Sequence, residues 1–297
     1  MIIDTFPGLE KGDLIGVAAP CARFDQSRLL QGIDSLNQMG FQVRIPEKIY
    51  EKKRYMAGDD LCRAAVINHL AADPDVKAII CARGGFGAMR MLAHLDWDLI
   101  RNHPKLFVGF SDATALLTAV MQQTGLSVVH GPNLVSLAAP DAPTLETFFA
   151  AVTGTLTGVT ADDGVCLKPG RAEGVLAGGN LATLAHLLGT PFTPDFTGTI
   201  LFLEDVGEPA YKIDRMLSQM KMAGVFTHVS GVVTGSFTQC DQQEYLHEIF
   251  DDIFAEYNIP VLMGLASGHG GTNMSLALGR RVFLDADARL LQWQDQK

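Results

Sequence analysis

The chain has 297 residues, a formal net charge of −10, 47% hydrophobic residues and 19% charged residues. This length is sufficient for two domains, each with its own core. The excess of acidic side chains argues against a surface for nucleic acid or anionic membrane, so we expect neither as a partner. A small substrate is still compatible with this charge, because a single local basic group can bind it.

No segment has the pattern of a targeting signal or a membrane span. Met1–Asp13 carries several charged side chains and therefore lacks an apolar signal-peptide core. The longest uncharged stretch, Ala113–Pro140, is broken by glutamine, glycine, histidine, proline and asparagine residues. The five cysteines are scattered, which fits free thiols in a reducing compartment better than a disulfide framework or a zinc site. We therefore expect a cytoplasmic protein.

The first half of the chain alternates apolar runs with helical patterns. The expected strands are Leu14–Ala19, Phe41–Ile45, Val76–Ala82, the run before Ser111, and Ser127–His130. The expected helices are Gln26–Met39, a helix from Asp59 or Asp60 to Ala72, one ending near Leu95, and one after Asp112. Such alternation predicts a parallel sheet covered on both faces, with ligands bound beyond the carboxyl ends of the strands. Three loops fall on that edge: after Ala19, after Ala82 and at Ser111.

The composition shifts between Pro132 and Gly164 towards alanine, threonine, proline and aspartate. We therefore expect an N-terminal domain over 1–135, a connection over 136–164 with one helix (Pro143–Val152), and a C-terminal domain over 165–297. The expected strands of this second domain are Val165–Leu167, Gly174–Leu176, Thr199–Leu203, Val229–Thr234, Pro260–Leu265 and Val282–Leu284. Its expected helices are Asn180–Leu188, Tyr211–Ala223 and Gln242–Tyr257.

One serine, Ser111, lies where an apolar strand gives way to a helical pattern, in Lys105–Thr114. Such an elbow lifts a hydroxyl out at the carboxyl end of the sheet, beside the N–H groups of a helix start, as in hydrolases with a nucleophile elbow. The simpler interpretation is that Ser111 or Asp112 only caps the helix, because both residue types are favoured there. Taken alone, this stretch favours the cap.

A glycine-rich segment, Arg83–Gly87, follows the third expected strand. Its backbone N–H groups are available to an oxyanion or a phosphate, although an ordinary glycine turn gives the same pattern. A nucleotide site is poorly supported, because the full G-x-G-x-x-G motif is absent and no acidic strand end follows at the expected distance.

Two further stretches carry groups for acid–base chemistry. The strand Thr199–Leu203 is followed by Glu204, Asp205 and Glu208. An acid at a strand end can orient a histidine, whereas an acidic helix start would explain Glu208 but not Glu204.

His269 lies among glycines on the loop Ser267–Asn273, just past an apolar strand. Most single histidines play no chemical role, and His130 near the sheet edge is a weaker second candidate. A serine, a glutamate and a histidine make a sensible set, in which the imidazole takes the serine proton and the carboxylate fixes its tautomer. Their spacing does not show that they meet.

Together these stretches resemble the L,D-carboxypeptidase family of serine peptidases, which includes muramoyltetrapeptide carboxypeptidases and microcin C immunity peptidases. The resemblance is carried in order by Arg83-Gly84-Gly85-Phe86-Gly87, Gly109-Phe110-Ser111-Asp112, Gly178-Gly179-Asn180-Leu181 with Leu188-Gly189-Thr190-Pro191, Leu203-Glu204-Asp205 with Ile213-Asp214-Arg215-Met216-Leu217, and Gly268-His269 with Asn273. Two positions depart from the family pattern: Ala277 stands where proline is common, and Phe86 where tyrosine is common.

The resemblance implies roles for five residues. Ser111 would be the nucleophile, His269 the general base and then acid, and Glu204 its orienting partner. The oxyanion hole would be formed by the backbone N–H groups of Gly85 and Asp112. The implied α/β fold has an N-terminal flavodoxin-like parallel-sheet domain and a C-terminal swivelling β/α domain, usually as a homodimer, with the site drawing residues from both domains.

The implied reaction is hydrolysis of the amide before the terminal D-alanine of a murein tetrapeptide, in cytoplasmic peptidoglycan recycling. The resemblance implies an acyl-enzyme on Ser111 and needs no metal or organic cofactor. Recognition of the substrate's free carboxylate needs a cation, for which Arg83 is a candidate, although a structural arginine paired with an acid is the more common case.

Two alternatives stay open. A related peptidase could cleave a toxic peptidyl-nucleotide, which would favour an aromatic residue on a catalytic loop. Trp97 and Trp293 lie away from the elbow and from Glu204 in the sequence, which disfavours this reading. A non-enzymatic ligand-binding α/β protein would use Ser111 only as a cap, and a phosphonate probe would then not label it.

Overall fold

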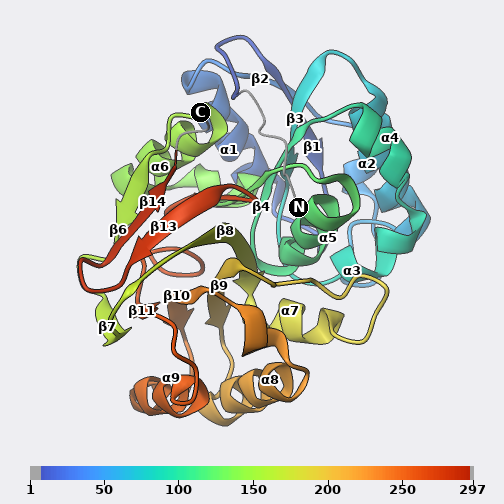
Figure 1. Ribbon diagram of the computed structural model, residues 1–297. Coiled ribbons are helices and arrows are strands. Elements are labelled where there is room, and N and C mark those ends of the chain that lie inside the picture. Colours follow the sequence, from blue (N-terminus) through green and yellow to red (C-terminus); the bar gives the residue numbers. More distant parts are fainter. Residues whose placement is uncertain (1–7, 295–297) are drawn as a thin grey trace. The chain divides into compact units, whose positions relative to one another are not determined.

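The computed structural model describes residues 8–294, and Figure 1 shows the order of the elements. The expectation that Met1–Asp13 holds no signal peptide therefore falls partly outside the described residues. The chain divides into two compact units: unit 1 is Met1–Leu156 with Ser275–Ala277, and unit 2 is Thr157–Met274 with Leu278–Lys297. Over the described range, no helix is both long enough and apolar enough to cross a membrane.

Unit 1 is built on a six-stranded sheet with the order β12-β5-β4-β3-β1-β2. The strands are β1 (Leu14–Ala18), β2 (Gln42–Arg44), β3 (Val76–Cys81), β4 (Leu106–Gly109), β5 (Val128–His130) and β12 (Leu276–Leu278). Neighbours from β2 to β5 pair in parallel. The order 2-1-3-4-5 is that of flavodoxin-like domains, so the predicted fold of the N-terminal part is confirmed.

Four of the six described helices of unit 1 begin at an aspartate that caps the helix. The six are α1 (Gln26–Gln38), α2 (Asp60–Ala72), α3 (Ala88–Met91), α4 (Trp97–Asn102), α5 (Thr114–Thr124) and α6 (Ala142–Val152). Asp25, Asp59 and Asp141 each accept a backbone N–H bond at the start of α1, α2 and α6. The strand order reverses after β2, so right-handed crossovers place α1 and α2 on opposite faces.

Continuous apolar runs explain the central strands of unit 1. The side chains of Ile79, Ile80, Phe107 and Val108 on β3 and β4 are at most 2% exposed, as expected for a parallel sheet buried on both faces. The reversal of strand order lies between β1 and β3, and the loops that follow these strands and β4 all leave the same sheet edge. That edge is where ligands bind in folds of this kind.

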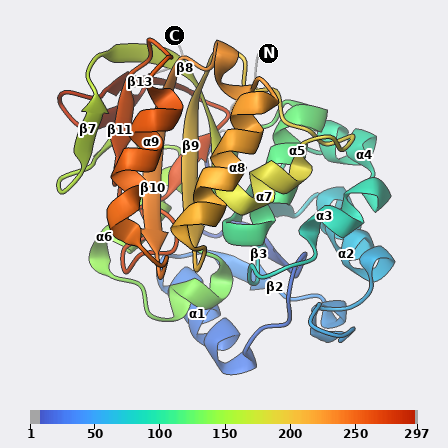
Figure 2. The ribbon, with the colours of Figure 1, turned by 90° about the horizontal axis from the view of Figure 1, so that it is seen from below.

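Unit 2 holds a mixed eight-stranded sheet with the order β6-β14-β13-β8-β9-β10-β11-β7. The strands are β6 (Gly158–Thr160), β7 (Val165–Lys168), β8 (Arg171–Asn180), β9 (Thr199–Val206), β10 (Gly231–Thr238), β11 (Val261–Met263), β13 (Arg281–Asp285) and β14 (Leu290–Trp293). The four central strands from β8 to β11 are parallel, and the outer strands pair antiparallel. Helices α7 (Leu181–Leu187), α8 (Ala210–Met222) and α9 (Leu246–Phe254) accompany the parallel part, and Figure 2 shows α8 and α9 side by side along β9 and β10.

The structure divides the chain differently from the expected 1–135, 136–164 and 165–297. The segment 136–164 contains α6, which belongs to unit 1, and β6, which pairs with β14 in unit 2. Ser275–Ala277 returns to unit 1, where β12 adjoins β5. The pairs β6–β14 and β5–β12 join residues that are more than a hundred positions apart, so no local sequence pattern indicates them.

Candidate active site

Ser111 occupies a strained backbone position at the end of β4. It is the first residue of a short 3-10 turn (Ser111–Ala113) that leads into α5, and its φ is +65°. A left-handed conformation costs a residue other than glycine on the order of 1–3 kcal/mol, and such strain is concentrated at functional sites. The turn and α5 have Phe110 and Ala113 as their N-caps, and neither cap makes a side-chain hydrogen bond. The interpretation of Ser111 or Asp112 as a helix cap is therefore wrong.

The glycine loop after β3 lies directly against this serine. A Cβ atom on Gly84 would stand 2.6 Å from the Ser111 Cβ and 2.8 Å from its Oγ, which is closer than real Cβ atoms approach. Gly85 has φ +109°, and its Cβ would stand 2.5 Å from the Cβ of Ala22. Neither position has room for a side chain, and the positive φ of Gly85 also favours glycine. The structure brings three of the predicted site residues, Ser111, Asp112 and Gly85, into one part of unit 1.

Asp112, next to the serine, bonds through its carboxylate to the first residue of α3. Its Oδ2 accepts the Ala88 N–H at 2.9 Å, and the residue is 8% exposed. Burial raises the pKa of Asp112, and the hydrogen bond from Ala88 opposes that rise. Burial also raises the pKa of the neighbouring Cys81 thiol to about 12, so this thiol stays protonated at neutral pH.

Asn133 is a site residue that the sequence did not reveal. It is 1% exposed, its Oδ1 accepts the Phe110 N–H at 3.3 Å, and its Nδ2 donates to the Phe110 carbonyl at 3.5 Å. One amide side chain therefore holds both polar backbone groups of the residue that precedes Ser111. The only signal was its place after β5, at the same sheet edge as the elbow.

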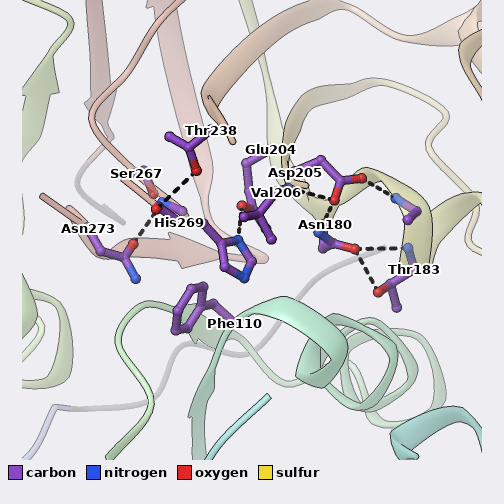
Figure 3. Close-up of polar contacts among 12 residues, drawn as sticks. Phe110, Asn180, Thr183, Glu204, Asp205, Val206, Thr238, Ser267, His269 and Asn273 are labelled. Atoms are coloured by element: carbon purple, nitrogen blue, oxygen red, sulfur yellow. Dashed lines mark hydrogen bonds and ion pairs between the residues drawn. The ribbon is translucent and has the colours of Figure 1, made fainter. Parts of the chain in front are cut away.

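In unit 2, Glu204 and His269 form a hydrogen-bonded pair (Figure 3). The distance from His269 Nδ1 to Glu204 Oε2 is 2.6 Å, and the glutamate side chain is fully buried. The carboxylate can only accept at this contact, so Nδ1 carries the proton and the neutral imidazole has its acceptor lone pair on Nε2. The predicted proximity of these two residues is present in the structure.

Glu204 lies within a strand rather than after one. The expected strand Thr199–Leu203 continues to Val206, because β9 pairs with β8 on one side and β10 on the other. Asn180 stands opposite Glu204 in the first pairing. The charges of Glu204 and Asp205 concealed this buried extension, because charged residues seldom occupy the middle of a sheet.

The loop that carries His269 is fixed by its own polar contacts. Asn273 Oδ1 accepts the Gly268 N–H at 2.9 Å, and Thr238 donates its hydroxyl to the His269 carbonyl at 3.1 Å. Gly268 has φ +108°, and a Cβ there would stand 2.5 Å from Glu204 Oε2. The loop therefore presses its backbone against the carboxylate that orients the histidine (Figure 3).

Asp205 anchors the other side of β9. Its Oδ1 accepts from Asn180 Nδ2 at 2.9 Å and from the Val206 N–H at 2.8 Å, and its Oδ2 accepts the Ala182 N–H at 2.8 Å. Burial nevertheless raises the pKa of Asp205 to about 6. The strand end that bears Glu204 is thus tied to the start of α7.

The two remaining candidates, Arg83 and His130, make contacts that fit a structural role. Exposed Arg83 donates to the Arg23 carbonyl at 2.8 Å, and the described ion pairs do not include it. His130 is fully buried, and its ring packs edge-on against that of Phe110, with 6.1 Å between the ring centroids. Within residues 8–294, no group of three or more histidine, cysteine, aspartate or glutamate side chains is arranged to hold a metal ion.

Comparison with known proteins identifies the class. Residues 15–131 match the family model "LD-carboxypeptidase N-terminal domain", and residues 173–284 match "LD-carboxypeptidase C-terminal domain". The strained serine elbow and the Glu204–His269 pair agree with a hydrolase of the serine type. The chain belongs to the LD-carboxypeptidase family and is an enzyme, a serine carboxypeptidase.

Individual relatives cover nearly the whole chain. The probable murein peptide carboxypeptidase of Bacillus subtilis is 37% identical over 93% of this chain and 90% of its own. The structure of muramoyltetrapeptide carboxypeptidase from Oxalobacter formigenes is 32% identical, with a TM-score of 0.86 over 95% of this chain and 99% of its own. The microcin C7 self-immunity protein MccF of Escherichia coli is 28% identical over 97% of this chain and 95% of its own.

Proposed function

We propose that this protein is an L,D-carboxypeptidase that removes the terminal D-alanine from murein tetrapeptides during cytoplasmic peptidoglycan recycling. The observation that carries the reaction type is the left-handed backbone of Ser111 beside the glycine loop, with no capping role for its side chain. The substrate class is supported by the names of the relatives that align over almost their full lengths.

The proposed reaction begins when Ser111 Oγ attacks the carbonyl carbon of the amide that precedes D-alanine. His269 Nε2 takes the hydroxyl proton, while Glu204 holds Nδ1–H and stabilises the imidazolium. The carbonyl oxygen becomes an oxyanion, for which the backbone N–H groups of Gly85 and Asp112 are the proposed donors. The C–N bond then breaks, the amine takes the proton from His269, and D-alanine leaves.

Water completes the cycle by hydrolysing the resulting ester on Ser111. His269 accepts a proton from the attacking water, and the ester carbonyl again becomes an oxyanion. When the C–O bond to Ser111 breaks, the serine oxygen recovers its proton from His269, and the tripeptide leaves with a new carboxylate. No residue changes oxidation state, and one water is consumed for each D-alanine released.

The test is incubation of purified murein tetrapeptide with wild type, Ser111→Ala and Ser27→Ala, followed by mass spectrometry. Ser27 is an exposed serine in α1 and serves as the matched control. We expect tripeptide and free D-alanine from wild type and Ser27→Ala, and none from Ser111→Ala. Folded wild type that leaves the tetrapeptide intact would contradict the proposed substrate, and equal turnover by all three proteins would contradict the proposed nucleophile.

A second candidate substrate is a peptidyl-nucleotide, favoured by the likeness to the microcin C7 self-immunity protein. Trp97 begins α4 in unit 1, and Trp293 lies buried in β14, so neither belongs to the elbow or to the His269 loop. The same mass-spectrometric assay with an aminoacyl sulfamoyl adenosine separates the two candidates. We also propose a homodimer, which light scattering after size-exclusion chromatography would test.

A further inference from the structure

One peptide group of the glycine loop is held at both ends by buried charged side chains. The Gly87 carbonyl accepts a hydrogen bond from Arg63 Nη1 at 2.8 Å, and the Ala88 N–H donates to Asp112 Oδ2 at 2.9 Å. These two groups belong to the same peptide plane, so the plane cannot rotate without breaking one of the bonds. Arg63 is 2% exposed and Asp112 is 8% exposed.

Arg63 also ties this loop to the neighbouring strand end. Its Nη1 donates to the Pro20 carbonyl after β1, and its Nη2 pairs with Asp60 in the first turn of α2. Gly87 has φ +139°, and a Cβ there would stand 2.7 Å from Arg63 Nη1. The glycine is thus needed for the guanidinium to reach the carbonyl. A buried charge is costly unless it is paired and hydrogen-bonded. The Arg63 guanidinium meets this condition by bonding to the segment after β1, to the glycine loop and to α2.

The other end of the loop is held by contacts with Ala22 and Ser111. The Gly84 carbonyl accepts the Ala22 N–H at 3.2 Å, and Gly84 packs against the serine side chain without room for a Cβ. Gly85 lies between the two anchored ends. Its φ of +109° is open to few other residues, and glycine by itself does not restrict that conformation. The anchors at Gly84 and Gly87 therefore supply the restriction.

We propose that Arg63 and Asp112 are positioning residues that together fix the Gly85 N–H relative to Ser111. The inference rests on the proposed function, in which Gly85 and Asp112 donate their N–H groups to the oxyanion. Asp112 then has two separate parts in the site: its backbone N–H faces the oxyanion, and its side chain holds the loop that brings the second donor. Loss of one oxyanion donor costs about 10²–10³ in kcat in serine hydrolases, which sets the expected scale.

The test compares Asp112→Ala with Asp112→Asn, and Arg63→Lys with Arg90→Lys. Asparagine keeps an oxygen that can accept the Ala88 N–H, whereas alanine removes it. Arg90 is the matched control, because its exposed side chain pairs with the same Asp60 at 2.7 Å. Only its backbone N–H bonds to the glycine loop, at the Gly87 carbonyl, and lysine keeps that bond. Circular dichroism and thermal unfolding would establish that each variant is folded.

Two readouts separate positioning from general damage. For D-alanine release, Asp112→Ala should lower kcat by about 10²–10³ with KM changed less than about threefold, and Asp112→Asn should recover most of that loss. Arg63→Lys should lower kcat by about tenfold or more, and Arg90→Lys should leave it unchanged. The rate at which a fluorophosphonate labels Ser111 should fall in the same order, because the phosphonyl adduct places its oxygen in the same hole.

The outcomes also distinguish this inference from the proposed function. If wild type releases D-alanine and folded Asp112→Ala keeps its kcat, the positioning role is wrong and the function stands. A loss that appears in KM alone would likewise overturn it. If wild type does not cleave the tetrapeptide but its Ser111 is labelled, the labelling rates of the variants decide the inference alone. If wild type neither cleaves nor is labelled, both proposals fall.

Discussion

The two units hold their site residues in different ways. In unit 1, Ser111 is placed by its backbone, through a φ of +65° and the absence of side-chain atoms on Gly84. In unit 2, His269 is placed by its side chain, through a 2.6 Å bond to the fully buried Glu204. The first arrangement depends on space that must stay empty, and the second on an acceptor that must stay present.

The largest effects should come from Ser111, the proposed nucleophile. Ser111→Ala and Ser111→Gly should each lower kcat by about 10⁶, because both remove the attacking oxygen. The two variants should differ in stability: glycine accepts the left-handed backbone, so Ser111→Gly should be more stable than Ser111→Ala by about 1 kcal/mol. Urea unfolding beside the kinetic assay checks both statements. Equal stabilities would show that the backbone at Ser111 stores no strain.

Glu204, the proposed orienting carboxylate, should rank next. Glu204→Gln keeps the size of the side chain but removes the negative charge that supports the imidazolium, and we expect a loss of about 10⁴ in kcat with KM little changed. Glu173→Gln is the control, because Glu173 lies on β8 with its side chain 54% exposed. The kinetic constants for D-alanine release decide the point. A loss below tenfold for Glu204→Gln would remove the glutamate from the proposed mechanism.

Added methyl groups test the two placements against each other. Gly84→Ala would press on Ser111, and Gly268→Ala would press on Glu204, since the added Cβ atoms would stand 2.6 Å and 2.5 Å from those side chains. Each should lower kcat by about 10² and the free energy of unfolding by about 1–3 kcal/mol.

Gly271→Ala is the control for both substitutions. It lies in the His269 loop, and a Cβ there would meet no atom within 4 Å. It should be active and stable. Full activity of Gly84→Ala would show that the glycine loop can shift and that the close approach of Gly84 does not place Ser111.

The smallest effect on activity is expected at Asp205, whose titration changes the stability of the fold. The pKa of this carboxyl is about 6 in the folded protein and near 3.9 when unfolded, so the folded state binds the proton more tightly. The contribution of Asp205 to stability therefore falls as pH rises from about 4 to 6, by about 3 kcal/mol in all. Above pH 6 the full penalty is present.

Asp205→Asn removes that titration. The free energy of unfolding of Asp205→Asn minus that of wild type should thus rise by a similar amount between pH 4 and pH 7. Asp98→Asn, at a side chain 84% exposed, should show no such rise. Urea unfolding at a series of pH values measures both differences. A flat difference for Asp205→Asn would show that its three N–H donors cancel the cost of burial.

The sequence predicted the fold class because its signals are local. Apolar runs such as Val76–Ala82 and helix caps such as Asp59 each act within a few residues. The α/β class and the flavodoxin-like strand order of unit 1 were confirmed. The extension of β9 through Glu204 and the return of β12 to unit 1 were missed, because both depend on partners far away in the sequence.

The proposed catalytic residues of the candidate site were predictable from the sequence, but the contacts around them were not. The motif residues Ser111, Glu204 and His269 were chosen from the sequence, and their catalytic roles stay proposals. The contacts that hold them were not predictable. Nothing in the order of residues showed that Asp112 would bond to Ala88 rather than cap α5, or that Asn133 would hold Phe110. Such contacts arise where loops from separate strands meet at one sheet edge, and only the fold brings those loops together.

The most direct test of the proposed catalytic set is a double-variant comparison of Ser111 and His269. We would measure kcat for D-alanine release in Ser111→Ala, His269→Ala and the variant with both substitutions. Residues that act as one catalytic unit give strongly non-additive losses. We expect each single variant to lose about 10⁶ in kcat and the double variant to be no worse than either. Losses that multiply in the double variant would contradict a shared catalytic unit, because Ser111 and His269 would then contribute independently.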